Sequence, residues 1–455
     1  MKTKMTILAC LLFAGMTLSA AVRTVGLSSF IGGGTTYTTV TAALSAATTG
    51  DTIFVAAGIY KEAELTIPAG VTIIGGFPAN AANIGTRVYT GTSSIAVSQW
   101  TILDGSAAHR VATVNGIIDG CIIRNGKHNT KGGGVLITTS GTVQNCFIRG
   151  NQCHNKTNDA IGGGAYLEGS AKLINSVVDY NMASQGFAVA GAGTVTNCTI
   201  VKNTNAPTWI LVPAAAGTTY GGAAISPFYL AQTETTVVQF LVFLNAKGVA
   251  ADCSYAMQTS DYAGFYPGTA GYTVVQTGNI SLFTNDTWTL LYFSNNIWAS
   301  SSSTYLTYPM ETVSWSGAAA YSSWLGGTLP REVEWEYAAT RAENATSAGF
   351  SYAGSNTLTD VGWTNSSVSQ TMKVALKKAN GIGLYDMTGN VSEWTSSAFP
   401  SSGYVFATEP INSPSLNRIT RGGDYGGGVN PNLASRGASF AWSTVAPYIG
   451  FRPKF

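Results

Sequence analysis

Few side chains in this sequence have the type and spacing that catalysis or metal binding requires. The first candidates are His128 and His154, which lie 26 residues apart, with Cys153 beside the second. Imidazole and thiolate groups are common metal ligands, so one interpretation is a surface metal site. The other interpretation, which we favour, places both histidines in solvated turns of a repeating structure.

Carboxylates offer a second possible chemistry. Glu332, Glu334 and Glu336 form a ladder that could serve acid and base catalysis. Pro330 stands just before them, and acids in the first turns of a helix that starts at proline complement the helix dipole. We therefore predict a structural role for the ladder. The acids in the first half of the chain are scattered. This argues against a polysaccharide lyase, which would need clustered carboxylates.

The first half of the chain repeats one pattern four times. The segments begin at residues 117, 143, 173 and 195, and they align Cys121, Cys146, Ser176 and Cys198. Each unit reads as strand, turn and strand, with apolar residues at every second position. Such a unit cannot bury its apolar face alone and must stack on its neighbours.

These repeats resemble the coils of right-handed parallel β-helix proteins, and we expect that architecture over residues 22–206. The resemblance implies that the four aligned residues form one inward row. Asparagines at the corners would satisfy turn backbone through their side chains. The segment Thr41 to Ala47 is predicted to form a short helix that plugs the first coil, whose edge would otherwise be open to aggregation.

Composition and the N-terminus place the chain outside the cell. The 455 residues are enough for two domains, and residues 1–21 read as a secretory signal peptide with Lys2 and Lys4 before an apolar run. No later stretch is long and apolar enough for a transmembrane segment. Removal of the signal lowers the formal charge from +2 to 0, which gives no reason to expect nucleic acid as a partner. We predict a secreted or bacterial cell-surface protein.

Several ordered blocks after Pro207 resemble the formylglycine-generating enzyme family. They include V-S-W-S-G-A-A-A-Y-S-S-W-L from 313, L-P-R-E-V-E-W-E-Y-A-A from 329 and G-L-Y-D-M-T-G-N-V-S-E-W from 383. Two closing motifs follow: a first frame, Arg421-Gly422-Gly423, and a second frame, Ile449-Gly450-Phe451-Arg452. The resemblance implies an α+β domain of C-type-lectin-like fold over residues 207–455. The whole chain is thus predicted to be mainly β. Independently, capping residues and apolar spacing predict a helix from Thr233 to Asn245.

The same resemblance argues against the chemistry of the family. Its enzymes carry two catalytic cysteines shortly after the first frame, and Gly427 and Asn432 stand at those places here. The second domain holds one cysteine, Cys253, far upstream, so we expect no catalytic residues and no copper. Resemblance also implies that Asn390 and Glu393 supply oxygen ligands to a structural Ca²⁺.

The segment between the two frames is the predicted ligand-binding patch. The residues assigned to it are Tyr425, Asn430, Asn432, Phe440, Trp442 and Ser443. This mixture of aromatic and small polar residues is typical of antibody loops, and the segment resembles the variable end of diversity-generating retroelement target proteins. We therefore predict a non-catalytic, adhesin-like binding protein whose partner is an extracellular protein or glycan.

Three alternatives to this function remain open. One is a sulfatase-modifying oxidase, which would need the paired thiols. Another is a carbohydrate-active β-helix protein with an accessory head. The third is a decayed enzyme whose C-terminal aromatic residues belong to its core.

Overall fold

A computed structural model describes most of the chain. The described residues are 21–27, 34–78, 80–81, 87, 99–257, 278–283, 291–294, 297–300, 302–340, 349–399, 417–428, 430–437, 439–441 and 443–455. We call residues 21–206 the N-terminal unit and residues 207–455 the C-terminal unit. Except for Ala21, the predicted signal peptide lies outside the described residues.

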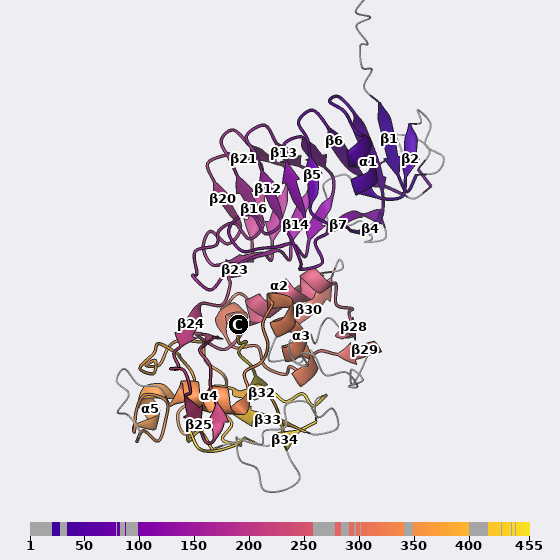
Figure 1. Ribbon diagram of the computed structural model, residues 1–455. Coiled ribbons are helices and arrows are strands. Elements are labelled where there is room, and N and C mark those ends of the chain that lie inside the picture. The colour runs from indigo at the N-terminus through magenta and orange to yellow at the C-terminus, as the bar shows by residue number, and fades with distance from the viewer. Residues whose placement is uncertain are drawn as a thin grey trace, which may run out of the picture.

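In its described residues, the N-terminal unit has four parallel sheets (Figure 1), and their inward side chains form the main buried cluster of this unit. The first sheet runs β2 (Thr35–Tyr37), β1 (Val22–Val25), β3 (Thr52–Ala56), β6 (Thr72–Phe77), β9 (Ile117–Asp119), β13 (Thr142–Gln144), β17 (Lys172–Ile174) and β21 (Thr194–Thr196). The second runs β22 (Thr199–Val201), β18 (Val177–Asp179), β14 (Phe147–Arg149), β10 (Ile122–Arg124), β7 (Thr101–Asp104) and β4 (Gly58–Lys61). The third runs β11 (Lys127–His128), β15 (Gln152–Cys153), β19 (Met182–Ala183) and β23 (Thr204–Asn205). The fourth runs β20 (Val189–Gly191), β16 (Ala165–Leu167), β12 (Val135–Ile137), β8 (Ala112–Val114) and β5 (Leu65–Ile67).

The repeats of the sequence set the register of these sheets. From β9 to β23 the chain visits the four sheets in one unchanging order, so each repeat adds one strand to each sheet. The pairing places Cys121, Cys146, Ser176 and Cys198 directly before equivalent strands of the second sheet. The two buried thiols among them belong to one core cluster, against which Cys198 packs. The predicted row is confirmed.

Asparagine side chains link successive repeats at one corner. The Nδ2 group of Asn151 donates to Oδ1 of Asn181 at 2.9 Å, and Asn181 donates in the same way to Asn203 at 2.9 Å. The same oxygens accept from the backbone N–H groups of Asn151 and Asn181. The predicted use of corner asparagines is confirmed, because each side chain satisfies the backbone of the neighbouring repeat.

A helix covers the N-terminal end of the sheets. Helix α1 (Val40–Ala46) begins one residue before its predicted start and buries Val40, Ala43 and Leu44 against the core of the sheets. Its N-terminal N–H groups are satisfied by Thr39 Oγ1 and by the carboxylate of Glu62. Such capping is what a helix needs where it starts without intrahelical partners.

The C-terminal unit has short helices around small sheets. Its helices are α2 (Val237–Lys247), α3 (Trp315–Leu325), α4 (Glu332–Ala339), α5 (Leu358–Val361) and the 3₁₀ helix η4 (Thr304–Thr307). The largest described sheet orders β34 (Ser439–Phe440), β33 (Arg418–Arg421), β32 (Ser392–Ala398) and β35 (Ile449–Gly450). Elsewhere among the described strands, two-stranded sheets pair β24 (Trp209–Val212) with β27 (Phe228–Ala231), β25 (Thr219–Tyr220) with β26 (Ala223–Ala224), β28 (Ser254–Met257) with β29 (Gly278–Ser281), and β30 (Leu291–Ser294) with β31 (Ile297–Ser300). The prediction of a mainly β chain is confirmed.

The predicted start of helix α2 was wrong by one turn. The cap is Thr236, whose hydroxyl accepts from Gln239 N while the Gln239 side chain accepts from Thr236 N. This reciprocal pair selects Thr236 over Thr233, because only Thr236 has a glutamine three residues later. Glu234 consequently lies outside the helix. None of the helices in the described part of the chain combines the length and apolar composition that crossing a bilayer demands.

The two units share one hydrophobic core. Tyr180, Met182 and Ala206 of the N-terminal unit belong to the same buried cluster as helices α2 and α3. Gln152 Nε2 donates to the carbonyl oxygen of Trp324 at 2.9 Å, and Lys127 Nζ donates to that of Leu325 at 2.8 Å. The last carbonyl groups of α3 thus have partners in the N-terminal unit, which a helix terminus requires when it is buried.

His154 lies at this junction, so its predicted place in a solvated turn was wrong. The side chain is 2 % exposed, its Nε2 bonds to Gln152 Oε1 at 2.7 Å, and its ring packs against Trp209 and Phe455. Burial lowers the pKa of His154 to about 3. His128 is half-buried, and its Nδ1 accepts from Thr130 N at 3.2 Å. In the part of the chain that the structure describes, neither histidine belongs to a group of three or more His, Cys, Asp and Glu side chains that could hold a metal ion.

The buried imidazole makes stability sensitive to acid. Because the folded pKa of His154 lies near 3 and the unfolded value near 6.5, the unfolded state binds the extra proton, and stability is lost as pH falls from about 6.5 towards 3. The loss should reach about 3 kcal/mol at pH 4. We expect denaturant unfolding of His154→Gln to show a shallower dependence of the unfolding free energy on pH than the wild type. Equal slopes from pH 7 to pH 4 would contradict the assignment.

Candidate binding surface at the end of the chain

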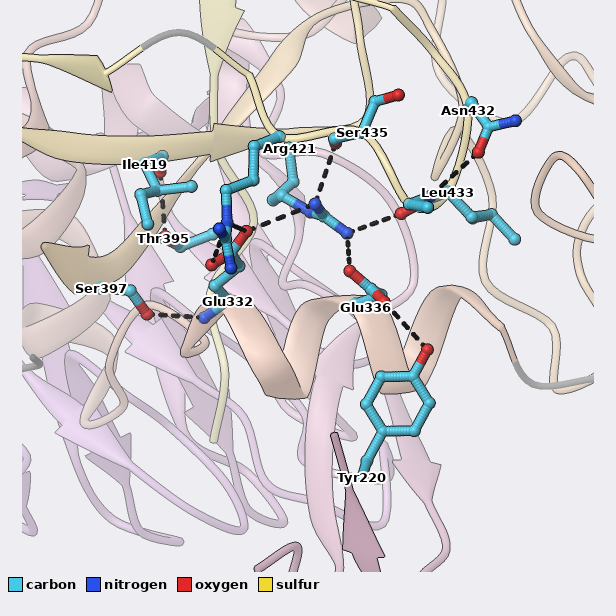
Figure 2. Close-up of polar contacts among 12 residues, drawn as sticks. Tyr220, Glu332, Glu336, Thr395, Ser397, Ile419, Arg421, Asn432, Leu433 and Ser435 are labelled. Carbon is cyan, nitrogen blue, oxygen red and sulfur yellow. Dashed lines mark hydrogen bonds and ion pairs between the residues drawn. The ribbon is translucent and has the colours of Figure 1, made fainter. Parts of the chain in front are cut away.

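The first frame is anchored by Arg421, which ends strand β33 and is fully buried. Its guanidinium donates to Glu332 Oε1 at 3.3 Å and contacts Glu336, both on helix α4. It also donates to the carbonyl oxygens of Leu433 at 2.6 Å and Ser435 at 2.9 Å (Figure 2). Arg421 therefore joins helix α4 to the backbone of the segment that follows the frame.

The second frame is anchored by Arg452 in the same manner. Its Nε and Nη2 groups form a fork on the Glu393 carboxylate, with Nη2 at 2.6 Å from Oε1 and Nε at 2.7 Å from Oε2. The guanidinium also donates to the carbonyl oxygens of Ala231 and Tyr385, at 3.1 and 2.8 Å. Trp335 Nε1 donates to the same carboxylate at 2.7 Å. Arg452 and Glu393 are both buried, so this pair has the strong bidentate geometry of a charge-assisted contact.

The carboxylate ladder of α4 has a structural role, as predicted, and its partners include Arg421 of the first frame and Lys454, which lies two residues after the second frame. The ion pairs are Glu332 with Arg421 and Arg436, Glu334 with Arg331 and Lys454, and Glu336 with Arg421. Burial opposes ionisation of Glu334, yet Lys454 and Arg331 outweigh it and hold its pKa below the usual range. The acids therefore fasten both ends of the predicted binding segment to one helix.

The backbone directly after the first frame is built around glycine. Asp424 is buried, and its Oδ1 accepts from Gly428 N at 3.3 Å. Gly427 has a φ of 74°, in the left-handed region that other residues rarely adopt. A Cβ atom at this position would lie 2.2 Å from Nδ2 of Asn365. A side chain at residue 427 therefore requires the backbone to change and Asn365 to move.

The structure separates the predicted patch residues by exposure. Asn430 and Ser443 are exposed, and Tyr425 and Asn432 are half-buried. The Tyr425 hydroxyl donates to Pro447 O at 3.4 Å. This hydrogen bond joins the beginning of the segment to its end. Asn430 and Asn432 accept from backbone N–H groups two residues further on, at 2.9 and 3.0 Å. Their side chains thus shape turns of this segment.

Phe440 and Trp442 differ from the other predicted patch residues in what the structure describes of them. Phe440 lies in β34 and is half-buried, with its ring edge-to-face against the core residue Trp394 at 6.1 Å. It is better described as the margin of the core than as a free contact residue. Trp442 lies outside the described residues.

The surroundings of Asn390 and Glu393 do not fit a calcium site. Glu393 is occupied by Arg452 and Trp335. Asn390 accepts from Met372 N at 2.8 Å through Oδ1 and donates to Glu234 at 2.7 Å through Nδ2. Within the described residues, no group of three or more His, Cys, Asp and Glu side chains could hold a metal ion. Both side chains have internal partners instead.

Buried acids beside Arg452 were missed from the sequence. Glu234 accepts from Val391 N at 3.1 Å, and burial, with nearby Asp386 and Glu393, raises its pKa well above the usual range. Burial raises the pKa of Asp386 to about 6. The sequence gives no clear signal for this group, because Glu234 lies in a polar run of threonines and Asp386 lies within G-L-Y-D-M-T-G-N, and neither setting reveals the partner.

Comparisons with known proteins place the C-terminal unit among relatives. Residues 202–453 match the sulfatase-modifying factor enzyme 1-like domain. The chain is 35% identical over 138 residues to the formylglycine-generating enzyme of Streptomyces coelicolor, covering 26% of this chain and 42% of that protein. It is 30% identical over 145 residues to the chaperone protein LppX of Paenibacillus barcinonensis, covering 28% and 48%. It is also 35% identical over 124 residues to the serine/threonine-protein kinase Pkn1 of Chlamydia trachomatis, covering 26% and 19%. The chain thus matches less than half the length of each of these relatives.

Two solved structures align with about half of this chain. Treponema denticola variable protein 1 aligns with 54% of this chain and 94% of its own length, at 18% identity and a TM-score of 0.34. CarF aligns with 55% of this chain and 98% of its own length, at 19% identity and a TM-score of 0.36.

Proposed function

The chain belongs to the sulfatase-modifying factor enzyme 1-like family, and we propose that it is a non-catalytic member that binds a ligand with the segment between its two frames. The main support for this proposal is the backbone conformation at Gly427. Resemblance puts a catalytic thiol at this residue, whereas the left-handed conformation here favours glycine. Asn432, at the place of the second thiol, uses its side chain to cap a turn.

We also propose an architecture and a location for the protein. The N-terminal unit would be a right-handed parallel β-helix over residues 22–206, which its cyclic strand order and parallel pairing support. Residues 207–455 would form a C-type-lectin-like head, with residues 1–21 as a signal for secretion to the bacterial surface. The stalk would present the head to an extracellular protein or glycan. More specifically, we propose that the protein is the target of a diversity-generating retroelement.

Oxidase activity is the first test. We expect the purified chain, incubated with copper and a sulfatase-type cysteine peptide, to produce no aldehyde above a control without protein. The physical reason is that oxygen activation in this family needs two thiolates to hold copper, and the last cysteine of the sequence is Cys253. The Streptomyces coelicolor formylglycine-generating enzyme serves as the positive control, and mass spectrometry of the peptide reports the product. Aldehyde formation by the chain would overturn the proposal.

Binding by the segment is the second test. Fluorescently labelled protein is applied to an array of immobilised glycans and purified extracellular proteins. We expect Tyr425→Ala to weaken capture by about 2 kcal/mol or more, since aromatic anchors dominate such interfaces. Tyr292→Ala is the matched control, because Tyr292 is an exposed tyrosine outside the segment, in β30.

A parallel melting experiment distinguishes contact residues from core residues. Trp442→Ala and Tyr425→Ala should leave the melting temperature near that of the wild type if both rings contact ligand. Truncation of a buried tryptophan instead costs about 3–5 kcal/mol. A large fall in melting temperature would identify these rings as core, and unchanged capture would exclude them as anchors.

A further inference from the structure

The last repeat of the N-terminal unit exposes side chains that every earlier repeat buries. Val195 continues the row of Ile118, Val143 and Leu173, which are completely buried, yet it is 41% exposed. Ile200 continues a second row of the same kind and is 44% exposed. The hydrophobic interior of the sheets therefore reaches the surface at this end.

The backbone at this end is also open. Strands β20, β21 and β22 are the terminal strands of three sheets. Figure 1 shows the C-terminal unit packed along the side of the sheets near β23, below the end formed by β20 and β21. Unpaired strand edges of this kind recruit further strands unless charges or other devices block them.

Charge does not block this end. Residues 186–205, which form the last repeat, include one charged residue, Lys202. Its Nζ lies 5.5 Å from the centre of the Tyr180 ring. Two such ends would approach each other with little electrostatic repulsion.

The opposite end of the sheets is covered, which limits how many copies can associate. Helix α1 covers the N-terminal end of the sheets and buries Val40, Ala43 and Leu44 against the core. Each chain therefore has one open end and one covered end. The open end presents the strand edges and apolar rows of one repeat. The surface that matches it best is another repeat, and the last repeat of a second copy provides one.

We propose that the open end, formed by β20, β21 and β22, joins the same end of a second copy of this chain. The contact is isologous, so Val195 and Ile200 of each copy contribute to it on both sides of a twofold axis. Because the other end is covered, association stops at two copies and does not continue into filaments.

The experiment is sedimentation equilibrium of the full mature chain over a wide concentration range. We expect a dimer for the wild type and a monomer for the double variant Val195→Glu/Ile200→Glu, which brings four carboxylates into the contact. Ile59→Glu is the matched control, because Ile59 is a 53% exposed isoleucine in β4 of the same unit, and it should remain dimeric. Circular dichroism melting confirms that each variant is folded.

A second, milder variant keeps the test valid if the glutamate variant does not fold. Val195→Thr/Ile200→Thr keeps the branched shape of both side chains and should weaken dimerisation at least tenfold. A monomeric wild type at all concentrations, a dimeric glutamate variant, or growth beyond two copies would each overturn the proposal. Failure of this test leaves the binding proposal for residues 424–448 intact, because glycan capture is measured separately.

Discussion

Replacing Arg452 by methionine is expected to lower the free energy of unfolding by about 3–5 kcal/mol. The reason is that Glu393 would remain buried with Trp335 as a donor but without its cation. A carboxylate left in this state must either stay charged in an apolar setting or take up a proton, and both are costly. Urea unfolding of the purified variant measures the change.

Two controls make this result specific. The double variant Arg452→Met/Glu393→Gln should recover part of the loss, because the Glu393 carboxylate is no longer left buried without its cation. Lys131→Met removes a pair with Glu168 whose side chains are 38% and 35% exposed, and it should change stability by no more than about 1 kcal/mol. A loss below about 1 kcal/mol for Arg452→Met would show that the second frame is not anchored by this pair.

Trp324→Ala is expected to cost about 3–5 kcal/mol and to separate the unfolding of the two units. The Trp324 indole N–H donates to Asn125 Oδ1 of the N-terminal unit at 3.0 Å, and its ring packs beside Phe243 and Tyr321. Its loss opens a cavity within the core that both units share. Calorimetry should show one cooperative transition for the wild type and two for the variant.

Trp100→Ala provides the comparison for this second result. Trp100 is 5% exposed and packs edge-to-face against Phe147 at 5.1 Å, within the N-terminal unit. It should lower stability without creating a second transition. Two transitions already present in the wild type would contradict the shared core.

Local signals in the sequence predicted the features that depend on neighbouring residues. Alternating apolar residues at a regular spacing predicted the stacked repeats, and the asparagine at each corner predicted the bonds between Asn151 and Asn181. The start of α2 shows the limit of such signals. Several threonines precede it, and the choice of Thr236 depends on the side chain of Gln239.

Features that depend on distant residues were not predictable in this way. His154 looks like a turn residue until Trp209 and Phe455 are placed against it. The acids of α4 look like a helix start until Arg421 is found more than eighty residues later in the chain. In both cases the deciding contact joins segments whose proximity follows from the tertiary fold, which no local pattern encodes.

Arg421 holds the segment after it in a manner that is indifferent to side-chain identity. Its guanidinium bonds to the carbonyl oxygens of Leu433 and Ser435, and Tyr425 N bonds to Asn390 O. Every amino acid supplies a backbone carbonyl, and every one except proline supplies an N–H group. Substitutions other than proline at Tyr425, and any substitution at Leu433 or Ser435, therefore keep the backbone groups that these contacts use. Gly427 is different, because its left-handed backbone restricts the choice of residue.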